Sequence, residues 1–236
     1  MNQKFLYLLI DLLSIFFPLV FSFHPKIRFY KHWRTAWAAI ALPAVIFIGW
    51  DIWFTGMGVW GFNPQYITGV YFINLPVEEV LFFICVPYAC LFTYQCVNVI
   101  SGRERLSAEV SNALSDVLAI GLCLVGLYYH DRWYTVVTFI STAVVLAIFS
   151  RVWKVSFMGR FYFAYLFILI PFFIVNGILT GTGLPSPIVW YKNLETMRLR
   201  MGTIPVEDAI YGMLLLVLNV ALFEYLEKRR PRSGPL

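Results

Sequence analysis

Seven long apolar runs limit what this chain can fold into more than any other feature of its sequence. An α-helix needs about 20 consecutive, mostly apolar residues to cross a bilayer. Only 13% of the residues are charged and 60% are hydrophobic, whereas about a quarter of a soluble domain is charged. The sequence therefore predicts an all-α integral membrane protein with about seven transmembrane helices, near residues 5–23, 36–54, 76–99, 112–129, 133–150, 161–180 and 205–226.

Lysine and arginine residues in the predicted loops indicate the orientation. If the N-terminus lies outside, the loops and tail that face the cytoplasm hold 13 of these residues and the opposite side holds five. Cytoplasmic loops of membrane proteins carry such an excess. We therefore expect an external N-terminus and a cytoplasmic C-terminus, in the inner (cytoplasmic) membrane of the cell. The net charge of +5 then reflects topology, and nucleic acid is not expected as a partner.

Cysteine and histidine residues give no sign of a metal site. The four cysteines form no Cys-x-x-Cys pair, and none of the three histidines stands beside a cysteine or a second histidine at ligand spacing. Buried cysteines in apolar runs are ordinary small hydrophobic residues. We therefore expect no bound metal.

Two segments of the sequence repeat the same motifs in the same order. Asp51 precedes Thr-Gly-Met-Gly at 55–58, and Asn176 precedes Thr-Gly-Thr-Gly at 180–183 with the same spacing. Pro-Val-Glu-Glu at 76–79 and Pro-Val-Glu-Asp at 205–208 then open the next apolar runs. Such self-similarity indicates a duplicated unit of about three helices.

The repeat also predicts how the chain is divided. We expect a first unit at 1–100, a linking segment with an extra helix at 101–132, a second unit at 133–228 and a cytoplasmic tail at 229–236. The extra helix makes the two units parallel in the membrane. All of the repeated motifs should therefore lie on the same, non-cytoplasmic side.

Acidic residues at the repeated motifs are the candidate catalytic groups. Acids in the first turn of a helix, just after a proline, are also ordinary helix starters. However, charges in spanning segments are costly and usually functional, and four of the 13 acids lie in these two motifs. We therefore predict catalytic roles for Glu78, Glu79, Glu207, Asp208 and Asp51.

The neighbours of these acids suggest the type of reaction. Glu79 lies one helical turn from Phe82 and Phe83, and Glu207 lies one turn from Tyr211. A carboxyl group in apolar surroundings can keep its proton and donate it, and aromatic faces stabilise a nearby cation. This combination suits the protonation of an alkene, ring closure of the carbocation and removal of a proton. The predicted substrate-binding residues are Trp60, Asn63, Phe82, Phe83, Asn176 and Tyr211.

Other aromatic residues stand at the predicted ends of the spans. Tryptophan and tyrosine are enriched where a membrane meets water. We therefore expect an interfacial belt that includes Trp33, Trp133, Tyr134, Trp190 and Tyr191.

The motif cluster resembles the membrane lycopene cyclases of bacteria, archaea and fungi. It comprises Trp50-Asp51, Thr-Gly-Met-Gly-Val-Trp-Gly-Phe-Asn-Pro at 55–64 and Asn-Leu-Pro-Val-Glu-Glu-Val-Leu-Phe-Phe at 74–83. Members of this family occur as two small subunits or as one fused chain, and this chain is similar to the fused form over nearly its whole length. One departure is Gln95, where the family pattern leads us to expect an acid after Tyr94.

The resemblance implies that the linear ψ-ends of lycopene become β-rings, giving γ-carotene and then β-carotene in carotenoid biosynthesis. It implies no redox change, no metal and no flavin, and no flavin-binding Gly-x-Gly-x-x-Gly turn opens a helix after a soluble strand here. The expected partners are the membrane and lipid-dissolved lycopene, with other carotenoid-pathway enzymes or a homo-oligomer left open. We expect the substrate to enter from lipid through a side opening between helices.

Other membrane proteins fit the sequence less well. A rhodopsin needs a lysine inside its last helix, and the last span has none before Lys228. A polyprenyl transferase needs aspartate-rich repeats that hold diphosphate through magnesium, and none is present. The strongest alternative is a proton-coupled carrier or channel that uses paired intramembrane acids.

Overall fold

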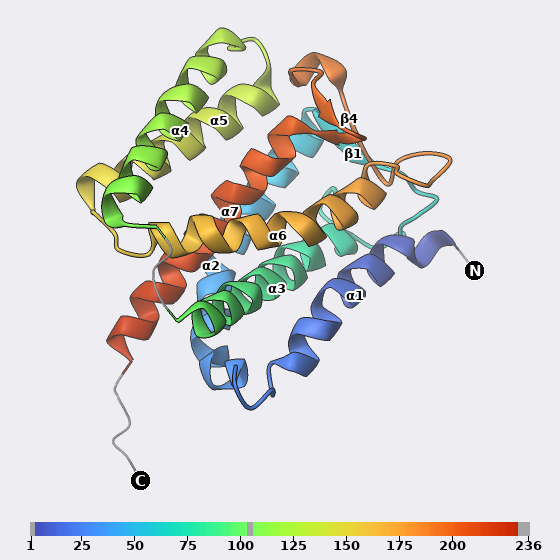
Figure 1. Cartoon of the computed structure of the whole chain (residues 1–236). Helices are drawn as coiled ribbons and strands as arrows, with labels where there is room; N and C mark the ends of the chain where they lie inside the picture. Colours follow the sequence, from blue (N-terminus) through green and yellow to red (C-terminus); the bar gives the residue numbers. More distant parts are fainter. Residues whose placement is uncertain (1–2, 103–105, 231–236) are drawn as a thin grey trace.

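The computed structural model describes residues 3–102 and 106–230. Arg103 and Arg105, two of the basic residues behind the predicted orientation, lie outside the described residues, as does most of the predicted tail at 229–236. Within the described ranges, seven helices are long and apolar enough to cross a membrane, which confirms the predicted fold class. They are α1 (Leu6–Phe21), α2 (Trp33–Gly56), α3 (Val77–Ser101), α4 (Ala108–Tyr128), α5 (Trp133–Ala147), α6 (Met158–Leu179) and α7 (Val206–Arg229) (Figure 1).

Short helical turns extend or join these helices. Turns of 3-10 helix cover Gln3–Phe5, Phe29–His32 and Asn193–Glu195, and a π-helical turn at Ile148–Val152 continues α5. With these turns included, the shortest spans, which contain α1 and α5, reach 19 and 20 residues. That length matches the hydrocarbon core of a bilayer.

The helices form two related units, α1–α3 and α5–α7, as the sequence repeat predicted. In each unit the first helix packs against the third, α1 on α3 and α5 on α7. Between the units, α2 packs on α7 and α6 packs on α3, which is the arrangement expected of a pseudo-twofold relation. The linking helix α4 lies outside this arrangement, against α5 and α6 (Figure 1).

Glycines end the second helix of each unit at the same motif position. In Thr-Gly-x-Gly, the second glycine adopts a left-handed backbone, with φ of 69° at Gly58 and 76° at Gly183. Residues with a Cβ rarely adopt this conformation, so glycine allows the chain to turn sharply out of the helix. The motif therefore marks where α2 and α6 stop and the long connections begin.

Each connection folds back on itself before the third helix starts. In the first unit β2 (Tyr71–Phe72) pairs with β3 (Leu75–Pro76), and in the second unit β5 (Arg200–Met201) pairs with β6 (Ile204–Pro205). Both hairpins end in the proline that precedes the acid pair. Proline lacks a backbone N–H, so it fits this position without loss of a helical hydrogen bond.

A third strand pair joins the two units directly. Strand β1 (Trp60–Phe62) runs antiparallel to β4 (Val189–Tyr191), with Gly61 opposite Trp190 at the centre. The backbone N–H of Asn63 also donates to the carbonyl of Ile188 at 2.8 Å. The connections of both units are thus tied together over the ends of the helices where the repeated motifs lie.

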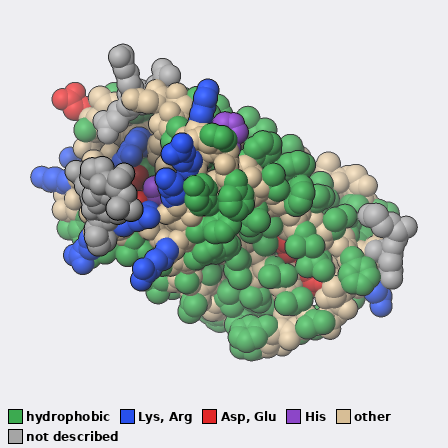
Figure 2. Space-filling model, turned by 90° about the horizontal axis from the view of Figure 1, so that it is seen from below, with side chains coloured by type: hydrophobic (Ala, Val, Ile, Leu, Met, Phe, Trp, Pro, Cys, Tyr) green, Lys and Arg blue, Asp and Glu red, His purple; other side chains and the backbone are tan. Residues whose placement is uncertain are grey.

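The surface separates apolar and basic side chains. On the face shown in Figure 2, lysine and arginine gather towards one end, and apolar side chains cover most of the rest. This distribution is typical of a protein surrounded by lipid. The orientation across the membrane stays a prediction.

Candidate active site

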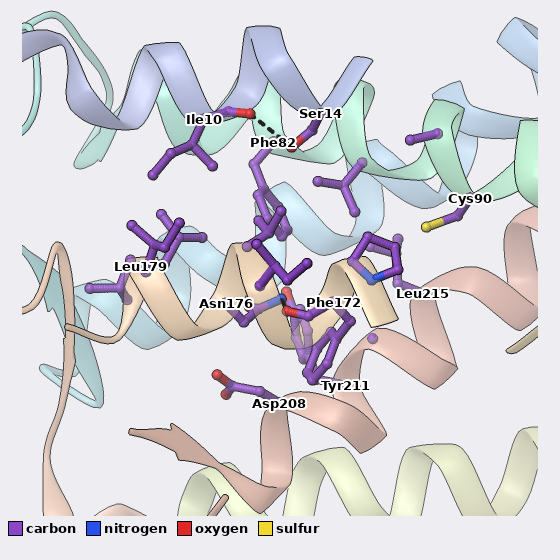
Figure 3. A pocket seen from close by; sticks show the side chains of 18 of the residues that line it. Ile10, Ser14, Phe82, Cys90, Phe172, Asn176, Leu179, Asp208, Tyr211 and Leu215 are labelled. Atoms are coloured by element: carbon purple, nitrogen blue, oxygen red, sulfur yellow. Dashed lines mark hydrogen bonds between the residues drawn. The ribbon is translucent and has the colours of Figure 1, made fainter. Parts of the chain in front are cut away.

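A cavity of about 570 Å³ lies among α1, α3, α6 and α7, beneath the joined connections. Its walls are mainly apolar, and three of the five predicted acids reach it: Asp51, Glu79 and Asp208. In Figure 3, Ile10 and Ser14 on α1 lie on one side, and Phe172 and Asn176 on α6 lie on the other. The volume falls in the range of about 300–1,000 Å³ that is usual for small-molecule sites.

Asp51 and Glu79 form a pair within one wall of the cavity. Asp51 lies on α2, Glu79 lies on α3, and their carboxyl groups are within hydrogen-bonding reach of each other. Tyr7 on α1 donates to Oε2 of Glu79 at 2.5 Å, and Tyr211 on α7 donates to Oδ1 of Asp51 at 2.8 Å. Three helices of the first unit and one helix of the second therefore build this pair.

Asp208 occupies in the second unit the place that Glu79 occupies in the first, and it accepts two tyrosine hydroxyls instead of one. Tyr134 on α5 donates to Oδ1 at 2.7 Å, and Tyr191 on β4 donates to Oδ2 at 3.0 Å. Burial, and then the nearby charge of Asp208, raise the pKa of the Tyr191 hydroxyl well above its usual range. Tyr191 therefore remains a hydrogen-bond donor at physiological pH.

Aromatic rings surround the space between the acids. The ring of Trp60 lies 5.0 Å from that of Tyr134 and 6.2 Å from that of Tyr211, in edge-on geometries. Tyr134 and Tyr191 stack at 5.8 Å between centroids. Several electron-rich faces at one place can stabilise a positive charge in a site that excludes water.

The cavity extends along α3 and α6 as an apolar channel. On α3 its lining runs from Glu79 to Thr93, and 14 residues of α-helix rise about 21 Å. On α6 the lining runs from Tyr165 to Leu179. The acids thus lie at one end of a long apolar space.

The side of the cavity opens between α1 and α6. Leu13, Phe17 and Ile174 line it and are each more than half exposed. All three lie in spanning helices, where an exposed side chain faces lipid rather than water. Part of the cavity lining therefore lies at the apolar surface of the spanning helices.

The structure places Glu78 and Glu207 outside the cavity lining. Oε1 of Glu78 accepts from the backbone N–H of Thr68 at 2.7 Å, and Oε1 of Glu207 accepts from that of Met197 at 2.6 Å. Both acids are fully buried, and Glu207 also accepts from the Thr135 hydroxyl at 2.7 Å. These contacts fix the connections at the same place in both units.

Four of the six predicted substrate-binding residues line the cavity, and two do not. Trp60, Phe82, Asn176 and Tyr211 line the cavity. Phe83 lies in the main apolar core instead. The Asn63 side chain donates to Ser186 Oγ at 2.9 Å and to the carbonyl of Pro187 at 3.3 Å, so it links the two connections and does not line the cavity.

Three tyrosines of the site were missed by the sequence reasoning. Tyr134 and Tyr191 were assigned to an interfacial belt, but their hydroxyls bind Asp208 inside the protein, so the prediction is wrong for these two. Tyr7 was not singled out at all. A signal did exist, because Tyr7 and Tyr134 are each the second residue of the first helix in their unit.

Comparison with known proteins agrees with this division into two units. A sequence model of the lycopene cyclase family matches residues 4–97 and 131–226. These segments cover α1, α2, α5 and α6 in full and all but the last residues of α3 and α7, so most of the chain is matched. Searches of curated proteins and of solved structures gave no significant match. With two matched segments that together hold all three carboxyl groups of the cavity, the chain belongs to the lycopene cyclase family, whose role is the cyclisation of carotenoids.

Proposed function

We propose that the protein is a lycopene β-cyclase, which converts the ψ-ends of lycopene into β-rings without a change of redox state. One observation carries this proposal. Three carboxyl groups, each held by tyrosine hydroxyls, meet at one end of an apolar cavity that opens towards lipid. A proton donor, a proton acceptor and aromatic rings are what an acid-catalysed ring closure requires.

The reaction has three steps at one end of the polyene. A carboxylic acid protonates C2 of the terminal C1=C2 double bond, which leaves a cation at C1. The C5=C6 double bond then attacks C1, the C1–C6 bond forms and the charge moves to C5. Loss of a proton from C6 forms the ring double bond between C5 and C6. One proton is added and one is lost, so no net proton or electron is consumed.

The substrate lies with one end at the acids and the rest along the channel. Trp60, Tyr134 and Tyr211 face the cation, and the apolar side chains of α3 and α6 contact the polyene. A polyene of about 30 Å, comparable to the bilayer core, is longer than the stretch of about 21 Å between Glu79 and Thr93. The far end therefore remains in the side opening or in lipid while the first ring forms.

Glu78 and Glu207 have a positioning role in this proposal. Their hydrogen bonds to Thr68 and Met197 hold the two connections that carry the aromatic residues over the cavity. The catalytic carboxyl groups are then Asp51, Glu79 and Asp208.

Pigment analysis in a bacterial host that accumulates lycopene tests this function. Cells that express the chain should contain γ-carotene and β-carotene, whereas cells with an empty vector should retain lycopene. If the well-expressed chain leaves lycopene unchanged but carries protons across vesicles, the paired acids belong to a proton-coupled carrier or channel and the proposed function is wrong.

A further inference from the structure

The two halves of the cavity are equivalent in position but not in chemistry. Glu79 and Asp208 follow the same Pro-Val-Glu motif, and each binds a tyrosine at the start of the first helix of its unit. Beyond these, the halves differ. Asn176 takes the place of Asp51, and Phe82, three residues after Glu79, takes the place of Tyr211, three residues after Asp208.

The strand pair adds a further difference. Strands β1 and β4 are antiparallel, with Gly61 opposite Trp190 at the centre. A twofold axis through this centre places β1 on β4, so that Phe62 takes the position of Tyr191. Tyr191 donates to Asp208, whereas Phe62 has no hydroxyl to offer Glu79. One half therefore holds two carboxyl groups, and the other holds one carboxyl group with two hydroxyl donors.

A carboxyl pair needs a proton to be stable. Two carboxylates can only accept hydrogen bonds, so they cannot bond to each other. Two like charges this close also cannot both be ionised. The contact between Asp51 and Glu79 therefore requires that one of them be protonated. Each of the two acids accepts one tyrosine hydroxyl on an oxygen atom. The pair therefore holds one proton at the edge of the cavity.

The hydrogen bonds around Asp208 suit a carboxylate without a proton. Both of its oxygens accept a hydroxyl, from Tyr134 and Tyr191. A carboxylate accepts hydrogen bonds on both oxygens, so this geometry matches the ionised form of Asp208. Asp208 thus faces the same cavity as an acceptor.

We propose that the Asp51–Glu79 pair donates the proton that starts each ring closure and that Asp208 removes the proton that ends it. This assignment rests on the proposed function. The pair gives its shared proton to C2, and Asp208 takes the proton from C6 as the electron pair of that C–H bond forms the C5=C6 double bond. Atoms and charges balance, and Asp208 afterwards holds the proton that the pair has lost.

The position of the ring double bond tests the assignment. From the cation at C5, loss of a proton from C6 gives a β-ring, from C4 an ε-ring, and from the methyl group on C5 an exocyclic double bond. A misplaced or weakened acceptor changes the ratio of these products. A weakened donor lowers their total but leaves the ratio unchanged.

The experiment compares four variants with the wild type in the lycopene-accumulating host. Glu79→Gln and Asp51→Asn should lower the total of cyclic products by about 100-fold or more, with β-rings still dominant in what remains. Asp208→Asn and Tyr191→Phe should lower the total and also raise the share of ε-rings and exocyclic rings several-fold. Protein amount and a single peak on gel filtration in detergent show which variants fold.

The outcomes separate this inference from the proposed function. If the wild type makes no rings, the proposed function is wrong. If the wild type makes β-rings but folded Asp208→Asn and Tyr191→Phe yield only β-rings or no rings at all, the role of Asp208 is overturned. A changed product ratio in Glu79→Gln would overturn the role of the pair. Tyr191→Phe, which keeps the aromatic ring, decides the matter if Asp208→Asn does not fold.

Discussion

The Tyr211 hydroxyl on α7 donates a hydrogen bond of 2.8 Å to Oδ1 of Asp51 on α2. A side chain of the second unit therefore completes the acid pair of the first unit. In the opposite direction, β1 of the first unit pairs with β4, which carries Tyr191 to Asp208. Neither unit holds a complete site by itself, which gives a physical reason why the two must be joined or must assemble.

Replacement of Tyr211 by phenylalanine should slow cyclisation by about 10-fold. The ring remains in place, but a buried carboxyl loses a hydrogen bond, which costs about 1–3 kcal/mol, and 1.4 kcal/mol corresponds to a factor of ten in rate. Ring formation per amount of folded protein measures the effect. The matched control is Tyr88→Phe, because the Tyr88 hydroxyl bonds to Ser22 and Trp33 away from the cavity. Equal rates in both variants would argue against a role for the Tyr211 hydroxyl.

Neighbouring acids in one motif should respond differently to the same substitution. Glutamine keeps the oxygen with which Glu78 accepts the Thr68 N–H, so Glu78→Gln should retain activity within a few-fold. Glu79→Gln removes the proton donor and should be nearly inactive although folded. Glu78→Ala should lower the melting temperature in detergent, since it leaves the partly buried N–H of Thr68 unpaired at a cost of about 1 kcal/mol. A folded but inactive Glu78→Gln would show that Glu78 takes part in the chemistry.

Bulky side chains at the opening between α1 and α6 should slow substrate entry. Ile174→Trp and Leu13→Trp place a large ring where these residues line the cavity and face lipid. Ile170→Trp and Leu12→Trp are matched controls, because these residues are similarly exposed but do not line the cavity. We expect cyclisation at low lycopene levels to fall several-fold in the first pair only. Full activity in both pairs would place the entrance elsewhere.

Orientation in the membrane can be tested with reporters at the chain ends. The excess of basic residues predicts an external N-terminus and a cytoplasmic C-terminus. A reporter that is active only outside the cytoplasm should therefore give a signal at the N-terminus and none at the C-terminus, and a cytoplasmic reporter should behave in the opposite way. A signal from both reporters on the same side would contradict the odd number of spans.

Much of the fold could be predicted because membrane spans leave strong local signals. Hydropathy located all seven helices, with boundaries that differ from the structure by only a few residues at most ends. The repeated Thr-Gly-x-Gly and Pro-Val-Glu motifs located the ends of α2 and α6 and the starts of α3 and α7. The paired strands β1 and β4 were not predicted, because three-residue strands leave almost no periodic pattern in a sequence.

The site was harder to predict because it depends on side-chain direction. Adjacent residues on a helix point about 100° apart, so of Glu78 and Glu79 only one reaches the cavity, and the motif alone does not say which. Tyr134 stands at the end of a span, where a tyrosine is expected to be interfacial. Its hydroxyl instead points into the protein and donates to Asp208 on another helix. Contacts across 72 and 74 positions, such as Tyr7 with Glu79 and Tyr134 with Asp208, require the tertiary structure.

Reconstitution of the purified chain tests the proposed cyclisation most directly. The protein would be placed in lipid vesicles that contain lycopene, and the carotenoids would be separated and identified over time. We expect γ-carotene to appear first and β-carotene to follow, with no conversion by Glu79→Gln in parallel vesicles. If lycopene persists unchanged with folded wild-type protein, or if Glu79→Gln converts it equally well, the acid-catalysed cyclisation proposed for this cavity is contradicted.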